Sequence, residues 1–503
     1  MAHRAAAEAL FFAGNRQLAE GDLAQAEASF RAALQCAPDF AEAHANLTYL
    51  LERSGQLAEA ETHYRCSIAA DPGIAQTRIN FGALLAGQKR FDDAEAEYRD
   101  AIDLRYDSAH AWSNLGALQA ARRQDDAAEA SFRFAQLLDP DYALAKFNFS
   151  YLLLRQGRFA EGWQYLEARH GYAQLQALLD CPRWQGEALA GRSILIGIEA
   201  GMGDMLQFCR YAALLKEKGA ARIGLLCHPG LKTLLESLAD VDEVIAADGE
   251  IPRTGWDCWT PLLSLPFHCQ TRIDSIPAKL PYLAAEEGKA KAWAARLRDP
   301  AWPHALNVGL VWKGNPRFEN DADRSLPDLG VLAPLGDVAG VRFFSLQKGQ
   351  GEEEAVNPPA RLQISNLASD IADFSDTAAI VANLDLVISV DTAVAHLAGA
   401  LGKPCWILLP DYKTDWRWLD ARSDSPWYPG VVRLFRQRVM GDWAEVVAEV
   451  GAALRERALA QYAALIAPTN CATPPIKPSH PRPGTSRNRV ISDGAPKRLG
   501  GPQ

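Results

Sequence analysis

The chain has 503 residues, 48% of them hydrophobic, and a formal net charge of −10. This length predicts about three domains, and the acidic balance argues against nucleic acid or an anionic membrane as the main partner. The nine cysteines occur singly, with no CxxC pair and no grouping with histidine at metal-ligand spacing. We therefore expect reduced thiols, no bound metal and a cytoplasmic protein.

The first residues, MAHRAAAEALFFAGNRQ, have only a short apolar run, which Glu8 interrupts. No other segment is apolar over the length that a bilayer requires. The sequence therefore predicts neither secretion nor membrane insertion.

A period of 34 residues runs through the first third of the sequence. Small residues occupy one phase of the period, aromatic residues a second and apolar residues a third. They are Ala26, Ala60, Ala94 and Ala128; Phe30, Tyr64, Tyr98 and Phe132; and Ala13, Leu47, Phe81, Leu115 and Phe149. This is the tetratricopeptide (TPR) pattern of stacked helical hairpins, in which small residues let two helices cross closely and the aromatic ring fills the gap.

Four full units and a divergent capping unit at 147–170 predict an α solenoid over residues 1–170. Asn46, Asn80 and Asn114 share another phase. Their side chains either contact an extended peptide on the concave face or are only hydrated.

From residue 192 onward, short apolar strands alternate with helices, which predicts parallel sheets covered on both faces. We expect strands at 193–198, 222–227, 243–245, 307–312, 341–346, 386–390 and 405–409. The predicted architecture is a pair of doubly wound, Rossmann-like domains at 192–300 and 301–466, with a linker at 171–191. Residues 467–503 are basic and rich in proline, which predicts a disordered tail.

The turns that follow the strands are the candidate sites, because ligands of open α/β sheets bind beyond the carboxyl ends of the strands. The first turn, EAGMGD, carries the turn glycines Gly201 and Gly203 and ends on Asp204. Its GxG lacks the third glycine of a dinucleotide fingerprint. Asp204 is either a helix cap or a catalytic base directed into a cleft.

The most informative stretch is VISVDTAVAHLAGALGKP at 387–404, a buried strand that stops on Asp391 and a helix that starts near Thr392. The first amides of a helix lack intrahelical acceptors, and the helix dipole adds positive charge there. The turn is therefore a predicted seat for a diphosphate, with Asp391 or Thr392 as the cap and His396 above it. Alternatively, His396 is a packed core histidine.

Three cations follow other strand ends, namely Lys313, Arg324 and Lys348. They either neutralise the same diphosphate or belong to solvated loops. A later loop-rich stretch contains Trp416, Trp418, Trp427 and Tyr428. These aromatic residues either stack on a base or sugar or pack between domains.

Together, the turn ending in Asp204, the RSLP segment at 324–327 and ISVDTAVAHLAGALGKP resemble the bacterial glycosyltransferase group that includes the lipopolysaccharide heptosyltransferases, glycosyltransferase family 9, in its form with repeats in front. The resemblance covers most of residues 192–465 and implies a GT-B fold. It places the base at Asp204 and the donor diphosphate at Arg324, Asp391, Thr392, Ala393 and His396. Ala393 replaces the family's glycine, Leu326 its tryptophan, and Arg324 the more usual lysine. Because of these departures, the resemblance does not identify the donor sugar.

We therefore expect a hexosyl- or heptosyl-type glycosyltransferase that moves a sugar from a nucleotide-sugar donor to an acceptor hydroxyl, with inversion and without a metal or cofactor. The acceptor is a protein, a peptide or a saccharide, and the repeats recruit a protein partner or the acceptor itself. The alternative is a non-catalytic TPR adaptor with a degenerate GT-B module. A nicotinamide-dependent oxidoreductase is disfavoured because the full glycine fingerprint and its downstream acid are missing.

Overall fold

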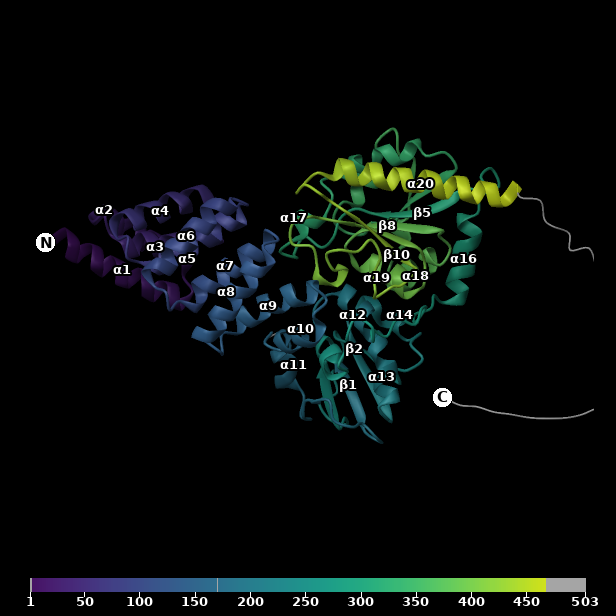
Figure 1. Ribbon diagram of the computed structural model, residues 1–503, viewed down its shortest axis with the longest axis horizontal. Helices are drawn as coiled ribbons and strands as arrows, with labels where there is room; N and C mark the ends of the chain where they lie inside the picture. The colour runs from purple at the N-terminus through teal and green to yellow at the C-terminus, as the bar shows by residue number, and fades with distance from the viewer. Residues whose placement is uncertain (1, 170, 467–503) are drawn as a thin grey trace, which may run out of the picture.

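The computed structural model describes residues 2–169 and 171–466. The chain forms a helical array followed by two parallel sheets with helices packed around them (Figure 1). The array extends to one side of the sheets. Within these residues, no helix combines the length and apolar character that crossing a membrane requires. The tail expected at 467–503 lies outside the described residues.

The array consists of five antiparallel helical hairpins, so the predicted tetratricopeptide repeats are confirmed. In three of these hairpins a glycine of the first helix lies where an aromatic ring of the second helix packs. A Cβ atom on Gly14 would come within 2.6 Å of the Phe30 ring, and one on Gly82 within 2.6 Å of Tyr98. The helices are α1 (Ala2–Glu20), α2 (Leu23–Cys36), α3 (Ala41–Arg53), α4 (Leu57–Ala70), α5 (Ala75–Gly87), α6 (Phe91–Leu104), α7 (Ala109–Ala121), α8 (Asp125–Leu138), α9 (Ala143–Arg155) and α10 (Phe159–Leu166).

A segment with its own short helix, α11 (Ala173–Leu178), leads from the array to the first sheet. The four strands of this sheet are all parallel, in the order β3-β2-β1-β4. The strands are β1 (Ser193–Gly197), β2 (Arg222–Cys227), β3 (Glu243–Ala246) and β4 (Cys258–Pro261), and the helices are α12 (Met202–Phe208), α13 (Ala212–Glu217), α14 (Lys232–Leu235) and α15 (Leu265–His268). Strand β4 was not predicted, because it is only four residues long and ends on a proline.

The second sheet has six parallel strands in the order β10-β9-β8-β5-β6-β7. The strands are β5 (Leu306–Val311), β6 (Val341–Ser345), β7 (Ile364–Asn366), β8 (Leu386–Val390), β9 (Cys405–Leu409) and β10 (Val432–Arg436). The helices are α16 (Glu287–Leu297), α17 (Asp321–Arg324), α18 (Phe374–Val381), α19 (Ala393–Ala400) and α20 (Trp443–Ile466). The strand order reverses between β5 and β8, so the turns after these two strands lie side by side.

The three parts share packed interfaces. Helix α12 beside the first sheet packs on α19 beside the second, and α9 of the array packs on the 3₁₀ helix η7 (Trp416–Trp418) that follows β9. One hydrophobic cluster contains Trp163 of the array and Trp427 of the second part. Their rings meet edge to face at 6.5 Å. The array is therefore packed against the loops that follow the strands.

Candidate functional site

The turn after β1 presents Asp204 in the first turn of α12. Its Oδ2 accepts a hydrogen bond of 2.9 Å from the backbone N–H of Gly201, the residue that precedes the helix. This bond satisfies an amide that the helix leaves without a partner. Its Oδ1 pairs with the guanidinium of Arg417, which follows a strand of the second sheet. Asp204 is therefore a capping residue and also half of an ion pair between the two sheet-containing parts.

The same turn is held in place by the end of the repeat array. The Arg169 guanidinium donates two hydrogen bonds, of 2.6 and 2.9 Å, to the two carboxylate oxygens of Glu199. Both side chains are buried, and a two-point contact of this kind fixes orientation as well as position. The array thus helps to position the turn that carries Asp204.

Gly203 lies at a tight contact between α12 and α19. A Cβ atom there would lie 3.0 Å from Cδ2 of His396 and 3.5 Å from Cα of Ala393. The lack of a side chain at Gly203 lets the first turn of α12 rest on the first turn of α19. Asp204 and the turn after β8 come from different sheets and are brought together by this contact.

The sequence analysis did not identify Arg417, which is only 8% exposed. Its guanidinium donates to Oδ2 of Asp415 at 2.7 Å and also pairs with Asp204. Burial acts to lower the pKa of Arg417, but the Asp204 and Asp415 carboxylates outweigh that effect and the pKa is raised. Arg417 therefore remains a cation between the two parts.

The turn after β8 lacks the side-chain capping bond that we expected at the start of α19. Thr392 precedes α19 without a side-chain capping bond, and its hydroxyl instead lies 2.9 Å from that of Ser389. Among the described residues, Asp391 makes no capping bond either, so Thr392 is the N-cap residue by position, as predicted, but neither side chain caps the helix. Burial, followed by the charge of Asp415, raises the pKa of Asp391 to about 6, although Arg324 and Arg417 act in the opposite direction.

His396 is enclosed in the first turns of α19. Its Nδ1 lies 2.8 Å from the hydroxyl of Tyr428, and its ring stacks on Trp418 at 5.3 Å. Burial, reinforced by the positive charges of Arg417 and Arg210, lowers the pKa of His396 well below its usual value. The ring is therefore neutral at pH 7, and its Nε2, 3.9 Å from Oδ1 of Asp391, makes no ion pair there.

The three predicted cations have different surroundings. The Nε of Arg324 lies 3.2 Å from Oδ1 of Asp321, and its charge acts on both Asp391 and His396. Lys313 pairs with Glu354 at 2.5 Å. Lys348 donates to the carbonyl of Ala368 at 2.8 Å and lies 3.6 Å from Glu352. Arg324 is thus the predicted cation whose charge reaches the turn, whereas the contacts of the two lysines are elsewhere.

The aromatic residues after β9 pack between the parts. Trp416, Trp418, Trp427 and Tyr428 are each at most 2% exposed. Trp163 of the array meets Trp416 edge to face at 5.2 Å. This burial favours packing over stacking on a base or sugar.

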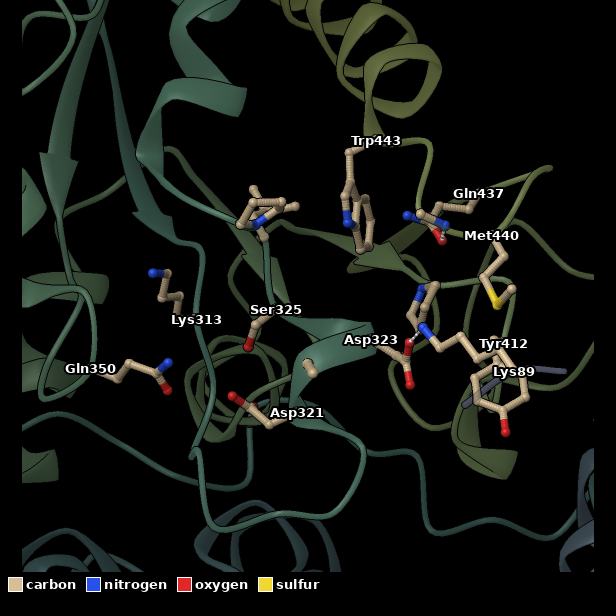
Figure 2. A pocket seen from close by; sticks show the side chains of 15 residues that line it. Lys89, Lys313, Asp321, Asp323, Ser325, Gln350, Tyr412, Gln437, Met440 and Trp443 are labelled. Carbon is tan, nitrogen blue, oxygen red and sulfur yellow. Dashed lines mark hydrogen bonds and ion pairs between the residues drawn. The ribbon is translucent and has the colours of Figure 1, made fainter. Parts of the chain in front are cut away.

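A cavity of about 370 Å³ opens beyond the carboxyl ends of β5, β9 and β10 (Figure 2). The loop after β5 contributes Lys313 and Ser325, and the segments after β9 and β10 contribute Tyr412 and Trp443. Lys89 of the repeat array reaches the same cavity and pairs with Asp323 on α17. The cavity is therefore walled by the second sheet's loops together with the array.

Among the described residues, no group of three or more His, Cys, Asp or Glu side chains is arranged to hold a metal ion. The functional candidate that the sequence analysis missed is Arg417. Its only sequence signal is its position in WRW, in a loop that follows a strand of the same sheet as the Asp391 turn.

Residues 335–408 match the family described as Glycosyltransferase family 9 (heptosyltransferase). The matched segment contains Lys348 and the turn from Asp391 to His396, but neither Asp204 nor Arg417. The chain is also 28% identical over 342 residues to Protein FlbA of Caulobacter vibrioides, a match that spans 63% of this chain and 56% of the relative. The match therefore spans little more than half of that protein's length.

Solved structures that are similar to part of the chain include those of pilF and YrrB. The structure on pilF of Pseudomonas aeruginosa is 21% identical and covers 43% of this chain and 89% of its own, with a TM-score of 0.34. YrrB, described as a TPR protein with an unusual peptide-binding site, is 18% identical and covers 32% and 82%, with a TM-score of 0.28. The 34-residue period and the five helical hairpins identify the chain as a tetratricopeptide-repeat protein, and its carboxyl-terminal module is similar to glycosyltransferase family 9 over residues 335–408.

Proposed function

We propose that this chain is a GT-B glycosyltransferase whose residues 192–300 and 301–466 form an acceptor-side and a donor-side domain. One observation carries the proposal. Asp204 and the Asp391–His396 turn belong to different sheets, yet they lie together where α12 rests on α19. A carboxylate on one side and a helix start with nearby cations on the other are the groups that glycosyl transfer needs.

The donor is a nucleotide sugar of the hexosyl or heptosyl class. Its diphosphate is held at the first amides of α19, beside Thr392 and Ala393, with Arg324 as the nearby cation. Negative charge grows on the diphosphate as the bond to the sugar breaks. Fixed positive charge at that place stabilises the transition state more than the ground state and therefore accelerates the reaction.

The acceptor hydroxyl is deprotonated by Asp204. Its oxygen forms a bond to the anomeric carbon while the bond from that carbon to the diphosphate oxygen breaks. The electron pair of the broken bond stays on the nucleoside diphosphate, and the proton moves to the Asp204 carboxylate. A single displacement of this kind inverts the configuration at the anomeric carbon. The repeats recruit the acceptor or a protein partner.

A second candidate is a non-catalytic TPR adaptor that only binds the nucleotide sugar. It is favoured by the engagement of both Asp204 oxygens, one by the Gly201 amide and one by Arg417. A general base needs a free carboxylate oxygen that can accept the proton of the acceptor hydroxyl, and neither Asp204 oxygen is free in this arrangement.

The test is to incubate the purified protein with a panel of sugar nucleotides, with and without candidate acceptors, and to measure released nucleoside diphosphate. The variant is Asp204→Asn, which keeps the shape and removes the proton acceptor. The matched control is Asp248→Asn, an exposed residue of the same part. Loss of a general base lowers turnover by about 10²–10⁴-fold.

Turnover in the parent and in Asp248→Asn, with its loss in Asp204→Asn, supports the enzyme. Donor binding without turnover on any donor and acceptor identifies the adaptor. Equal turnover in the parent, Asp204→Asn and Asp248→Asn would show that Asp204 is not the catalytic base.

A further inference from the structure

Arg417 is a buried cation between the two regions to which the proposed function assigns the acceptor and the donor. Its guanidinium carbon lies 4.6 Å from the centre of the Trp416 ring and 5.6 Å from that of Phe208. Phe208 belongs to α12 and Trp416 to η7, so the side chain spans the interface between the two parts. Both rings lie within cation–π distance of the guanidinium.

Arg417 has two carboxylate partners, Asp415 in its own loop and Asp204 across the interface. Asp415 accepts from the guanidinium at 2.7 Å and also from the backbone N–H of Arg417 at 2.9 Å, so it belongs to the same small loop. Asp204 reaches Arg417 across the interface with a single oxygen. Among the described residues, Nε of Arg417 has no hydrogen-bond partner although it is buried. A buried donor without an acceptor is unfavourable, so the site favours a ligand that brings an additional acceptor oxygen.

A phosphate group meets this requirement. It carries several acceptor oxygens and matches the planar fork of a guanidinium. The charge of Arg417 also acts on Asp391 and His396, which places it within electrostatic reach of the turn that the proposed function assigns to the diphosphate.

We propose that Arg417 binds the diphosphate of the donor and gives up Asp204 when it does so, an inference that rests on the proposed function. The ion pair between Asp204 and Arg417 is then the donor-free state of the site. Donor binding releases Oδ1 of Asp204, which becomes available to the acceptor hydroxyl. The acceptor base is thus freed only after the donor is in place, which favours donor binding before acceptor binding.

Calorimetric titration tests the exchange without any acceptor. The probes are uridine, adenosine, guanosine and cytidine diphosphates and inorganic pyrophosphate, titrated into the parent chain, Asp204→Asn and Arg417→Gln. Because Asp204 competes with the phosphates for Arg417, Asp204→Asn should bind the preferred probe about tenfold more tightly than the parent, and Arg417→Gln at least about tenfold more weakly. Arg417→Lys, which keeps the charge but not the fork, should fall between the parent and Arg417→Gln.

Arg422→Gln is the control, because Arg422 is an exposed arginine of the same loop that pairs with Asp424. It should bind the probe as the parent does. Thermal melts of every variant show whether it is folded. If Arg417→Gln unfolds, the comparison of Asp204→Asn with Arg417→Lys still decides the question, because the exchange predicts tighter binding in the first and weaker binding in the second, whereas the loss of a nearby negative charge alone predicts only the first.

The inference is overturned if Asp204→Asn binds no probe more tightly than the parent does, including the case in which nothing binds either protein. Tighter binding in Asp204→Asn supports the exchange even where the parent shows no turnover. In that case only the proposed catalysis fails. If the parent turns over the donor but Asp204→Asn binds the probes no differently, the proposed glycosyltransferase activity is supported and the exchange of Arg417 from Asp204 to the diphosphate is contradicted.

Discussion

Lys89, in the turn between α5 and α6 of the repeat array, pairs with Asp323 on α17. The next residue on that short helix is Arg324, the cation whose charge reaches the Asp391 turn. One helical turn therefore connects the array on one side with the proposed donor site on the other. We therefore expect a change at the Lys89–Asp323 pair to affect donor binding through α17.

The first prediction is that Lys89→Glu weakens the binding of the preferred nucleoside diphosphate. Two like charges would face each other at Asp323 and displace α17 together with Arg324. The loss should be about two- to fivefold, because a partly exposed pair contributes about 0.5–1 kcal/mol. Calorimetric titration measures it.

The charge-reversed double variant Lys89→Glu with Asp323→Lys should recover most of the affinity. Arg99→Glu, on the exposed surface of α6, is the control and should bind as the parent does. Equal affinities in Lys89→Glu and the parent would show that α17 does not transmit the contact.

The second prediction concerns Tyr151 of α9. This residue precedes Arg155 by one helical turn, and Nε of Arg155 lies 3.2 Å from Asp420 of the second part. Tyr151 keeps 41% of its surface open, yet its pKa is raised, first by burial of the hydroxyl and then by the charges of Asp415 and Asp204. The charge of the proposed acceptor base, Asp204, therefore acts on a tyrosine hydroxyl of the repeat array.

We expect Tyr151→Ala to lower kcat/KM for the acceptor by about tenfold, the effect of one lost contact to a substrate. The donor dissociation constant should not change. Initial rates against acceptor concentration, with calorimetry of the donor, separate the two effects. Tyr49→Ala, another partly exposed tyrosine of the array, should leave both values unchanged. An equal loss in both variants would point to a general effect of altering the array.

The third prediction is that Gly203→Val separates α12 from α19. The added carbon would lie 3.0 Å from the His396 ring, which Tyr428 and Trp418 hold in place. Overpacking at such a contact lowers the unfolding free energy by about 1–3 kcal/mol. Chemical denaturation measures the change. Gly230→Val is the comparison, since the nearest atom to its Cβ is 3.9 Å away. Similar losses in the two variants would contradict a tight contact at Gly203.

The fourth prediction is a pH dependence of stability that originates at Asp391. Its pKa of about 6 in the folded chain lies above the ordinary value of 3.8, so the folded state holds this proton more tightly than the unfolded chain does. The resulting destabilisation is fully present above about pH 6 and disappears as the pH falls below about 4. At its largest it amounts to about 3 kcal/mol.

Asp391→Asn should therefore be more stable than the parent above pH 6, and the difference should shrink toward pH 4. Unfolding free energies at several pH values from 4 to 8 give the curve. Asp248→Asn should follow the parent throughout. A difference between Asp391→Asn and the parent that is constant with pH would rule out this carboxyl as the titrating group.

Local patterns in the sequence predicted most of the fold. The 34-residue period identified the repeats because each hairpin repeats the same local packing, as between Gly14 and Phe30. Strands β1, β2, β8 and β9 begin where expected because each is a continuous apolar run. Strand β7 has three partly or fully exposed residues, and β10 follows a long loop. Both were missed because neither presents such a run.

The candidate site was predictable only in part. The rule that ligands bind beyond strand ends pointed to Asp204 and to the turn at Asp391 separately. The pairing of Asp204 with Arg417 joins residues 213 positions apart, and that of Lys89 with Asp323 joins residues 234 apart. No periodicity encodes such contacts, because they depend on how whole units dock.

Asp420 is contacted by two arginines of the array, Arg123 and Arg155. The repeats are therefore not a portable binding module attached by a tether. A chimaera that replaced them with repeats of another protein would leave this carboxylate without its two arginines and would remove Lys89 from the cavity wall. Repeats could therefore be replaced without breaking these contacts only in the hairpins farthest from the sheets, α1 to α4 (Figure 1).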